Sequence, residues 1–457
     1  MKGEAEGQTD AGPLSGHDLP GLADPIDQLQ MPMEVGPMKG KLRIVRVTVL
    51  LAVVALVLSA CGGGGGQTSG GGAQTGSGAQ LLIWTGGGPG GEATKKLGEA
   101  WGKENGVNVA VQLVPENLQT QFVTASQAGK APDVVMGAHD WIGNLVQNGA
   151  IDPIQMTEDT RAAYEKLAIE AVTFNGQTYG VPFTMNNIVL FRNTDLAPEA
   201  PSSIEDMVAT GKQLKAAGKT SEILALPVGP TGDPYHINPL YTSGGGYMFG
   251  QQPEGGYDPK DLGVGKPSSI QAYEKIAALG EKGEGALKRS IAGDNILSLF
   301  TAKKTAFMIS GPWQFADLKK TKLHYDVSPV PAFEGGKPAR PFITVDAAYV
   351  ASKGQNKLLA QEFVTNYWST PEVNLALFKA SPNVPALKAA LEQIKASDPL
   401  VVKVADAGRK SGQIMPSIPE MAAVWDPLGK AEAAVVAGSD PASSISAAGK
   451  AIQASLK

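Results

Sequence analysis

Short apolar runs alternate with helix-like spacing of apolar residues from Leu81 onward, which is typical of an α/β chain. The run LLIWT at 81–85 predicts a strand, and residues 92–105 repeat apolar side chains at helical spacing. The run VNVAVQL at 107–113 then completes a strand–helix–strand unit. Because further units of this kind follow, the pattern predicts mostly parallel sheets.

Local turn and capping signals divide the rest of the chain. The segment FNGQTYGVPF at 174–183 contains an Asn-Gly turn and predicts a hairpin. Ser203, followed three residues later by Asp206, predicts the start of a helix that ends before Gly218. Asn117 is expected to cap another helix with its side chain.

Three stretches of different composition precede these elements. Residues 1–37 show no sustained period, and we interpret them as an extension outside the native protein, with translation starting at Met38. Residues 38–60 have the layout of a secretory signal peptide, since basic residues precede the apolar run VTVLLAVVALVL at 47–58. A bilayer-spanning helix needs about 20 apolar residues, so this run does not predict a retained span.

The sequence LSAC at 58–61 resembles a bacterial lipobox, in which the cysteine becomes the first mature residue and carries lipid. Cys61 is the single cysteine of the chain and therefore has no internal disulfide partner. We expect lipid on Cys61 to anchor the protein to the outer face of the bacterial cytoplasmic membrane. Residues 61–80 are rich in glycine and predict a flexible tether.

Charge and motif content exclude several classes of function. The chain has 39 basic and 44 acidic residues, a formal net charge of −5, which argues against nucleic-acid binding. Four histidines without zinc-ligand spacing predict no metal site and no cofactor. The sequence contains neither a Walker A motif nor a Ser, His or Cys catalytic signature, so we expect a protein that is not an enzyme.

The loop GGGPGG at 86–91 meets the G-x-G-x-x-G pattern of a dinucleotide site. Pro89 removes one N–H group that would have to hold phosphate, and the strand at 107–113 does not end in an acid for the ribose. We therefore reject a dinucleotide site at this loop.

An ordered set of segments resembles the maltose/maltodextrin-binding proteins, the extracellular solute-binding proteins of bacterial ABC sugar importers, over essentially the whole mature chain. The segments are APDVVMGAHDWIGNLVQNGAIDPI, FNGQTYGVPF, GDPYHINPLYTSGGGYMFG, AFMISGPWQF and IMPSIPEMAAVW. The resemblance implies a periplasmic-binding-protein-like fold of two discontinuous α/β lobes, joined by a three-crossing hinge, with sugar between them. It places the first lobe at 81–185 and 345–392, and the second at 186–344 and 393–457.

The resemblance also implies roles for individual residues. A pyranose has an apolar C–H face, which aromatic rings cover, and hydroxyl groups, which carboxylates and amides bind. By correspondence, Trp313, Trp425 and Tyr235 are the stacking rings, and Asp140 and Asp233 bind hydroxyl groups. Met415 lies in the last matching segment and is a further candidate contact.

At four positions the sequence departs from the family pattern, and these departures remove expected sugar contacts from the first-lobe side of the site. Gly88 and Pro89 stand where the family has an acid and a lysine. Gly137 replaces an aromatic residue, for which Trp141 is a candidate substitute. Asn186 occupies the place of a family carboxylate. These changes favour an oligosaccharide held mainly by the stacking half of the site.

The resulting hypothesis is a monomer that captures a malto-oligosaccharide, or a related oligosaccharide, outside the cytoplasm. It would deliver the sugar to the permease of an ABC importer, whose separate ATPase subunit hydrolyses ATP. A secreted carbohydrate-cleaving enzyme is the alternative from another class, because a glycosidase needs only two carboxylates and a sugar groove. A third alternative keeps the fold with a peptide, polyamine or anion as ligand.

Overall fold

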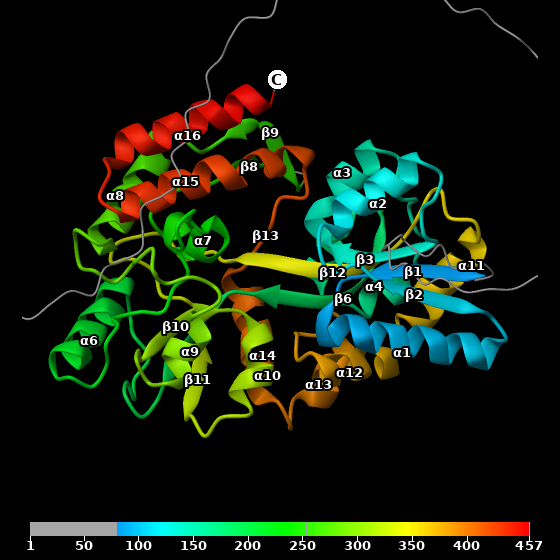
Figure 1. The fold of residues 1–457 in the computed structure, drawn as a ribbon, viewed down its shortest axis with the longest axis horizontal. Coiled ribbons are helices and arrows are strands. Elements are labelled where there is room, and N and C mark those ends of the chain that lie inside the picture. The colour runs from blue at the N-terminus through cyan, green and yellow to red at the C-terminus, as the bar shows by residue number, and fades with distance from the viewer. Residues whose placement is uncertain (1–79, 253–254, 457) are drawn as a thin grey trace, which may run out of the picture. The chain divides into compact units, whose positions relative to one another are not determined.

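The structure, a computed structural model, describes residues 80–252 and 255–456. The expected extension at 1–37, the signal peptide at 38–60, the lipidation of Cys61 and nearly all of the tether lie outside the described residues. The described residues belong to one compact unit, drawn in Figure 1. Among them, no helix is both long and apolar enough to cross a bilayer.

The first lobe is built on a sheet whose first three strands in the sequence are parallel. Strand β1 (Leu81–Thr85) is followed by helix α1 (Gly88–Asn105) and strand β2 (Val109–Leu113). Strand β1 pairs in parallel with both β2 and β3 (Val134–Ala138). This confirms the strand–helix–strand unit that the sequence pattern predicts.

Two long strands complete this sheet and change its character. Strands β6 (Gly180–Asn187) and β12 (Phe342–Val350) lie side by side and antiparallel, as Figure 1 shows. Strand β12 is also antiparallel to β3, whereas the short β13 (Gln413–Ile414) pairs with it in parallel. The expectation of mostly parallel sheets is therefore wrong, because β6 runs against β12 instead of following a crossover helix.

The second lobe contains a three-stranded antiparallel sheet. Strand β7 (Val189–Asn193) lies between β10 (Phe307–Ser310) and β11 (Tyr325–Ser328), and all five residues of β7 are buried. Helix α7 (Pro234–Ser243) and helix α15 (Trp425–Val436) pack beside it in this lobe. This sheet also departs from the parallel expectation.

The other elements have the following bounds. Those before β7 are α2 (Leu118–Gln127), the 3-10 helix η1 (His139–Trp141), α3 (Ile142–Gln147), α4 (Glu158–Ala162), α5 (Lys166–Ala171), β4 (Thr173–Phe174) and β5 (Gln177–Thr178). Those between β7 and β12 are α6 (Ile204–Ala216), β8 (Phe249–Gln251), β9 (Tyr257–Leu262), α8 (Pro267–Leu279), α9 (Ile296–Thr301), η2 (Pro312–Gln314) and α10 (Phe315–Leu318). Those after β12 are α11 (Lys357–Glu362), the π-helix η3 (Phe363–Tyr367), α12 (Pro371–Ala380), α13 (Lys388–Ile394), α14 (Pro399–Ser411), η4 (Pro419–Ala423) and α16 (Pro441–Ser455).

Local sequence signals explain several element ends. Asn175 and Gly176 have φ values of 49° and 75°, as a tight hairpin turn requires, and they join β4 to β5. The Ser203 hydroxyl accepts a hydrogen bond from the Asp206 N–H at 3.0 Å, which caps α6. Asn117 precedes α2 but has a left-handed φ of 52° and makes no capping hydrogen bond, so that expectation is wrong.

Separate buried clusters of apolar residues form the cores of the lobes. Met185 belongs to the cluster around β1, β3 and β12, whereas Ile188 belongs to the cluster around α7 and α15. Phe342 and Ile343 are divided between the same two clusters. The chain thus changes lobes between β6 and β7 and again at the start of β12. The lobe limits given by the family resemblance stay a prediction.

Candidate functional site

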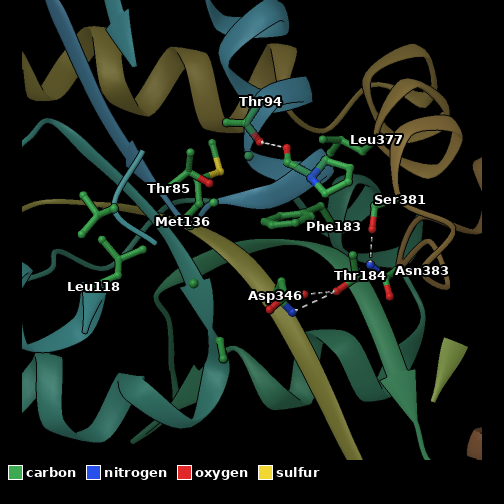
Figure 2. A pocket seen from close by; sticks show the side chains of 18 of the residues that line it. Thr85, Thr94, Leu118, Met136, Phe183, Thr184, Asp346, Leu377, Ser381 and Asn383 are labelled. Atoms are coloured by element: carbon green, nitrogen blue, oxygen red, sulfur yellow. Dashed lines mark hydrogen bonds between the residues drawn. The ribbon is translucent and has the colours of Figure 1, made fainter. Parts of the chain in front are cut away.

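A cavity opens where the carboxyl ends of the first-lobe strands meet. Strands β1 and β3 are parallel, so both end at the same edge of the sheet. Strand β1 continues into the glycine loop 86–91, and β3 continues into η1. The cavity at this edge has a volume of about 640 Å³. It is lined in part by Thr85, Gly86, Gly90, Leu118, Met136, Trp141, Phe183, Thr184, Asp346, Asn374, Leu377, Ser381 and Asn383, nine of which Figure 2 labels.

A second cavity of about 510 Å³ adjoins the first, because Gln119 and Thr120 line both. Asp140 contributes to it from the end of β3, and Trp425 contributes to it from the start of α15. Two residues that the family resemblance selects, one in each expected lobe, therefore line the same cavity. This brings together an acceptor and an aromatic ring that are far apart in the sequence.

The three aromatic residues expected to stack on sugar form one group. The rings of Trp313 and Tyr235 are 6.4 Å apart between centroids, at 37°. Tyr235 stacks on Phe342 at 6.2 Å and 27°, and Phe342 meets Trp425 edge-on at 6.4 Å. Trp313 is 37% exposed, whereas Phe342 is 2% exposed. Phe342 is thus a buried support that joins the expected rings.

Two carboxyl groups of the first-lobe sheet lie in a low-dielectric setting. Burial raises the pKa of Asp140 to about 6, and the nearby charge of Asp346 adds to this increase. Asp140 Oδ1 is buried without a hydrogen-bond partner among the described residues. Burial also raises the pKa of Asp346, although the Thr184 hydroxyl donates to Asp346 Oδ2 at 2.7 Å. Asp140 therefore offers a free acceptor to a ligand.

Tyr235 connects the aromatic group with these acids. Burial raises the pKa of the Tyr235 phenol, and the charges of Asp346 and Asp140 contribute to this increase. The phenol oxygen lies 3.4 Å from Thr344 Oγ1 in β12. The aromatic residues of the second lobe and the acids of the first lobe therefore approach one another at β12.

Three other residues selected from the sequence have structural partners. The Asp233 carboxylate accepts from the His236 N–H at 3.1 Å and caps α7, while its other oxygen contacts the His236 ring at 2.8 Å. Asn186 accepts from the Val384 N–H at 3.1 Å. Met415 is 5% exposed and belongs to the core around α7 and α15. Asp233, Asn186 and Met415 are absent from the linings of both cavities, and a sugar contact for each stays a prediction.

Sequence reasoning did not find Phe342, Asp346, Phe183 or Asn374. The sequence did contain a signal for Asp346, because it is a carboxylate inside the apolar strand FITVDAAYV. Burial of a carboxylate is unfavourable unless it has a polar partner or a ligand. Phe342 and Phe183 look like ordinary core residues in the sequence. The partners that give them a place in the site come from distant segments. Among residues 80–252 and 255–456, no cluster of His, Cys, Asp and Glu could hold a metal ion.

The comparisons with known proteins agree with this arrangement. The family model of bacterial extracellular solute-binding proteins matches residues 96–403. The chain is 29% identical to the galactooligosaccharide-binding protein of Bacillus subtilis, over 90% of this chain and 97% of the relative. It is 27% identical to a maltooligosaccharide ABC transporter solute-binding lipoprotein of Streptococcus pneumoniae, over 73% of this chain and 78% of the relative. It is 26% identical to the maltotriose-binding protein of Pyrococcus abyssi, over 70% and 68% of the two chains.

These matches confirm the family resemblance and the two-lobe periplasmic-binding-protein-like fold class that it implied. The family model covers well over half of the chain, and it spans both long strands, β6 and β12, and the rings of Tyr235, Trp313 and Phe342. The chain belongs to the bacterial extracellular solute-binding protein family.

Proposed function

We propose that the protein captures an oligosaccharide between its lobes and delivers it to the permease of an ABC importer. One observation carries the proposal: Asp140 of the first lobe and Trp425 of the second line the same cavity, beside the ring group of Trp313, Tyr235 and Phe342. Aromatic faces cover the apolar side of a pyranose, and a free carboxylate oxygen accepts from its hydroxyl groups. The names of the relatives, which bind galacto- and malto-oligosaccharides, support the same ligand class.

Ligand binding would drive the lobes together. A sugar that contacts both Asp140 and Trp425 binds more strongly when the two lobes are closed than when they are open, and only this difference shifts the equilibrium. The strands β6 and β12, which pass between the lobes, are the segments about which closure would occur. The permease would then recognise the closed form, which differs from the empty protein in shape.

We also propose that lipid on Cys61 holds the protein at the outer face of the cytoplasmic membrane. The motif LSAC and the word lipoprotein in the name of the pneumococcal relative support this. Replacement of Cys61 by Ser should move the protein from the membrane fraction to the medium. Continued membrane retention of the Cys61→Ser protein would count against the anchor without affecting the binding proposal.

Titration calorimetry of residues 80–457 with malto- and galacto-oligosaccharides tests the sugar-binding proposal. We expect saturable heat and a change in tryptophan fluorescence, and a loss of affinity of at least tenfold in Trp425→Ala and Trp313→Ala. Leu358→Ala, at a side chain that is 89% exposed, is the matched control and should bind like the parent. The absence of both binding heat and a fluorescence change with every sugar of the panel would refute the proposal. Release of new reducing ends would support the glycosidase alternative.

A further inference from the structure

The side chain of His236 is fixed by Asp233 at the start of helix α7. Asp233 Oδ1 accepts from the His236 N–H at 3.1 Å, and Asp233 Oδ2 lies 2.8 Å from Nδ1 of the ring. Because a carboxylate oxygen only accepts, Nδ1 carries a hydrogen and donates it. The Nε2 atom of the ring is buried and has no hydrogen-bond partner among the described residues. The bond to Asp233 therefore sets the orientation of this ring.

The carboxylate of Asp233 thus uses both of its oxygens inside the protein. An aspartate side chain is short enough to cap the helix that it precedes, as Asp233 caps α7. The residue also lies outside the linings of the two cavities in the cleft. This geometry favours a role within the protein over the direct sugar contact that the family resemblance implies.

The fixed ring of His236 packs edge-on against two of the rings expected to stack on sugar. Its centroid lies 6.1 Å from that of Trp313, at 86°, and 5.3 Å from that of Tyr235, at 84°. Such T-shaped pairs are a favoured arrangement of aromatic rings. Trp313 and Tyr235 are themselves 6.4 Å apart, at 37°. His236 therefore contacts both members of the pair.

Trp313 depends on these neighbours because it is a partly exposed residue. A Cβ atom placed on Gly311 would lie 2.1 Å from Cζ3 and 2.2 Å from Cη2 of Trp313, so the indole lies directly against the Gly311 backbone. The residue is nevertheless 37% exposed. A side chain with open space beside it keeps rotamer freedom unless its neighbours restrict it. The ring of His236 supplies such a restriction.

The start of α7 is itself held against α15, which lies beside it in Figure 1. Glu432 Oε1 accepts from the Asp233 N–H at 2.7 Å. Gly232 has a φ of 79°, and a Cβ atom placed on it would lie 2.0 Å from the carbonyl oxygen of Gly429. A glycine is required for this φ and this close approach. Asp233 therefore has a fixed position relative to α15, the helix that begins at Trp425.

We propose that His236 is a positioning residue for sugar binding, which holds Trp313 and Tyr235 at the angle at which both stack on the oligosaccharide. Asp233 acts through the ring of His236 and does not contact the sugar. The inference rests on the proposed function. It requires that Asp233 and His236 affect affinity as one unit.

A double-mutant cycle, measured by calorimetry with maltotriose, tests this role. Asp233→Ser keeps an oxygen that caps α7 but removes the partner of the ring, so affinity should fall roughly fivefold. His236→Phe has a ring of similar size that needs no hydrogen bond, and it should bind nearly as well as the parent protein. In His236→Phe, the further change Asp233→Ser should have no effect. His236→Ala, which has no ring, should lose roughly tenfold in affinity.

Asp440→Ser is the matched control for the cycle. Asp440 also precedes a proline and caps its helix, α16, by accepting from the Ser443 N–H at 2.8 Å. Its replacement should leave the affinity unchanged. If Asp233→Ser lowers affinity by the same factor in the parent protein and in His236→Phe, Asp233 contacts the sugar itself and the proposal is wrong.

The fluorescence of Trp313 without sugar is a second readout. Its emission is the difference between each protein and the same protein with Trp313→Phe. Asp233→Ser and His236→Ala should make this emission more sensitive to quenching by acrylamide, and His236→Phe should not. Unchanged quenching in the first two variants would overturn the positioning role although sugar binding stands. If the parent protein binds no sugar at all, the proposed function itself has failed, and the positioning role fails with it.

Discussion

The His139 ring is completely buried, and its Nε2 atom lies 3.1 Å from the carbonyl oxygen of Met415. The Val345 N–H donates to the other ring nitrogen, Nδ1, at 3.1 Å. Because Nδ1 accepts, Nε2 must carry the hydrogen and donate to Met415. The neutral ring therefore joins the end of β3 to β12 and to the segment after β13, directly beside Asp140.

This ring should make the protein sensitive to acid. Burial lowers the pKa of His139 to about 4 in the folded protein, from an ordinary value of 6.5. The unfolded chain therefore binds a proton more readily between pH 6.5 and 4, and stability falls as the pH drops through this window. The resulting decrease in unfolding free energy that His139 causes should reach about 3 kcal/mol. Urea unfolding at pH 7 and pH 4.5 measures it.

The matched variant is His139→Gln, which can donate to Met415 but does not titrate. It should be less stable than the parent protein at pH 7, because the Val345 N–H loses its acceptor. The difference in unfolding free energy between the variant and the parent protein should shrink or reverse at pH 4.5. An equal difference at both pH values would show that His139 does not cause the acid sensitivity.

Glu432 should make stability depend on pH in the opposite direction from His139. Its Oε1 atom accepts from the Asp233 N–H at 2.7 Å, and its Oε2 atom accepts from the Tyr273 hydroxyl at 3.2 Å. Burial raises the pKa of this carboxyl to about 8, from 4.5. The folded protein keeps a proton that the unfolded chain releases, so stability falls as the pH rises from 4.5 to 8.

Glu432→Gln tests this carboxyl, because the amide is neutral at every pH and keeps an acceptor for the Asp233 N–H. Between pH 5 and pH 8 we expect the variant to gain roughly 3 kcal/mol in unfolding free energy relative to the parent protein. Thermal or urea unfolding at the two pH values measures the change. A constant difference would mean that Glu432 is already ionised in the folded protein at pH 5.

Local features of the fold were predictable from the sequence, whereas pairings between distant segments were not. The turn at Asn175 and Gly176 and the cap at Ser203 depend on neighbouring residues alone, and both predictions are confirmed. The pairing of β12 with β6 and β3 joins segments more than 150 residues apart, and no local pattern encodes its direction. The mostly parallel sheet was predicted wrongly for this reason.

The candidate site shows the same division. Asp140, Trp425 and Tyr235 were selected because their segments match a family, and the structure brings them together. Phe342 was missed because a single Phe at the start of a strand has no distinctive pattern. The packing of His236 against Trp313 was missed because the two residues are far apart in the sequence.

Asp140 predicts how sugar binding depends on pH. With a pKa raised to about 6, its carboxyl is ionised at pH 7.5 and mostly protonated at pH 5. The ionised form accepts hydrogen bonds more strongly, so we expect affinity for maltotriose to fall roughly tenfold over this range. Asp346, whose pKa burial also raises, lies nearby and could titrate as well. Asp140→Asn should bind more weakly at pH 7.5 and lose most of the pH dependence. A parallel decline in both proteins would assign the effect to another group.

Phe342 should control the placement of the sugar-stacking rings without contacting sugar itself. Its ring is 2% exposed and lies between Tyr235 and Trp425. Phe342→Leu keeps an apolar side chain of similar size, so the loss of unfolding free energy should be about 1.5 kcal/mol. Tyr235 and Trp425 lose their aromatic neighbour, and affinity for oligosaccharide should fall several-fold. Calorimetry and urea unfolding of the same preparation separate the two effects. Phe315→Leu, at a buried ring of a different core cluster, is the control and should lose stability with unchanged affinity. Equal affinities of Phe342→Leu and the parent protein would show that Tyr235 and Trp425 are held in place without Phe342.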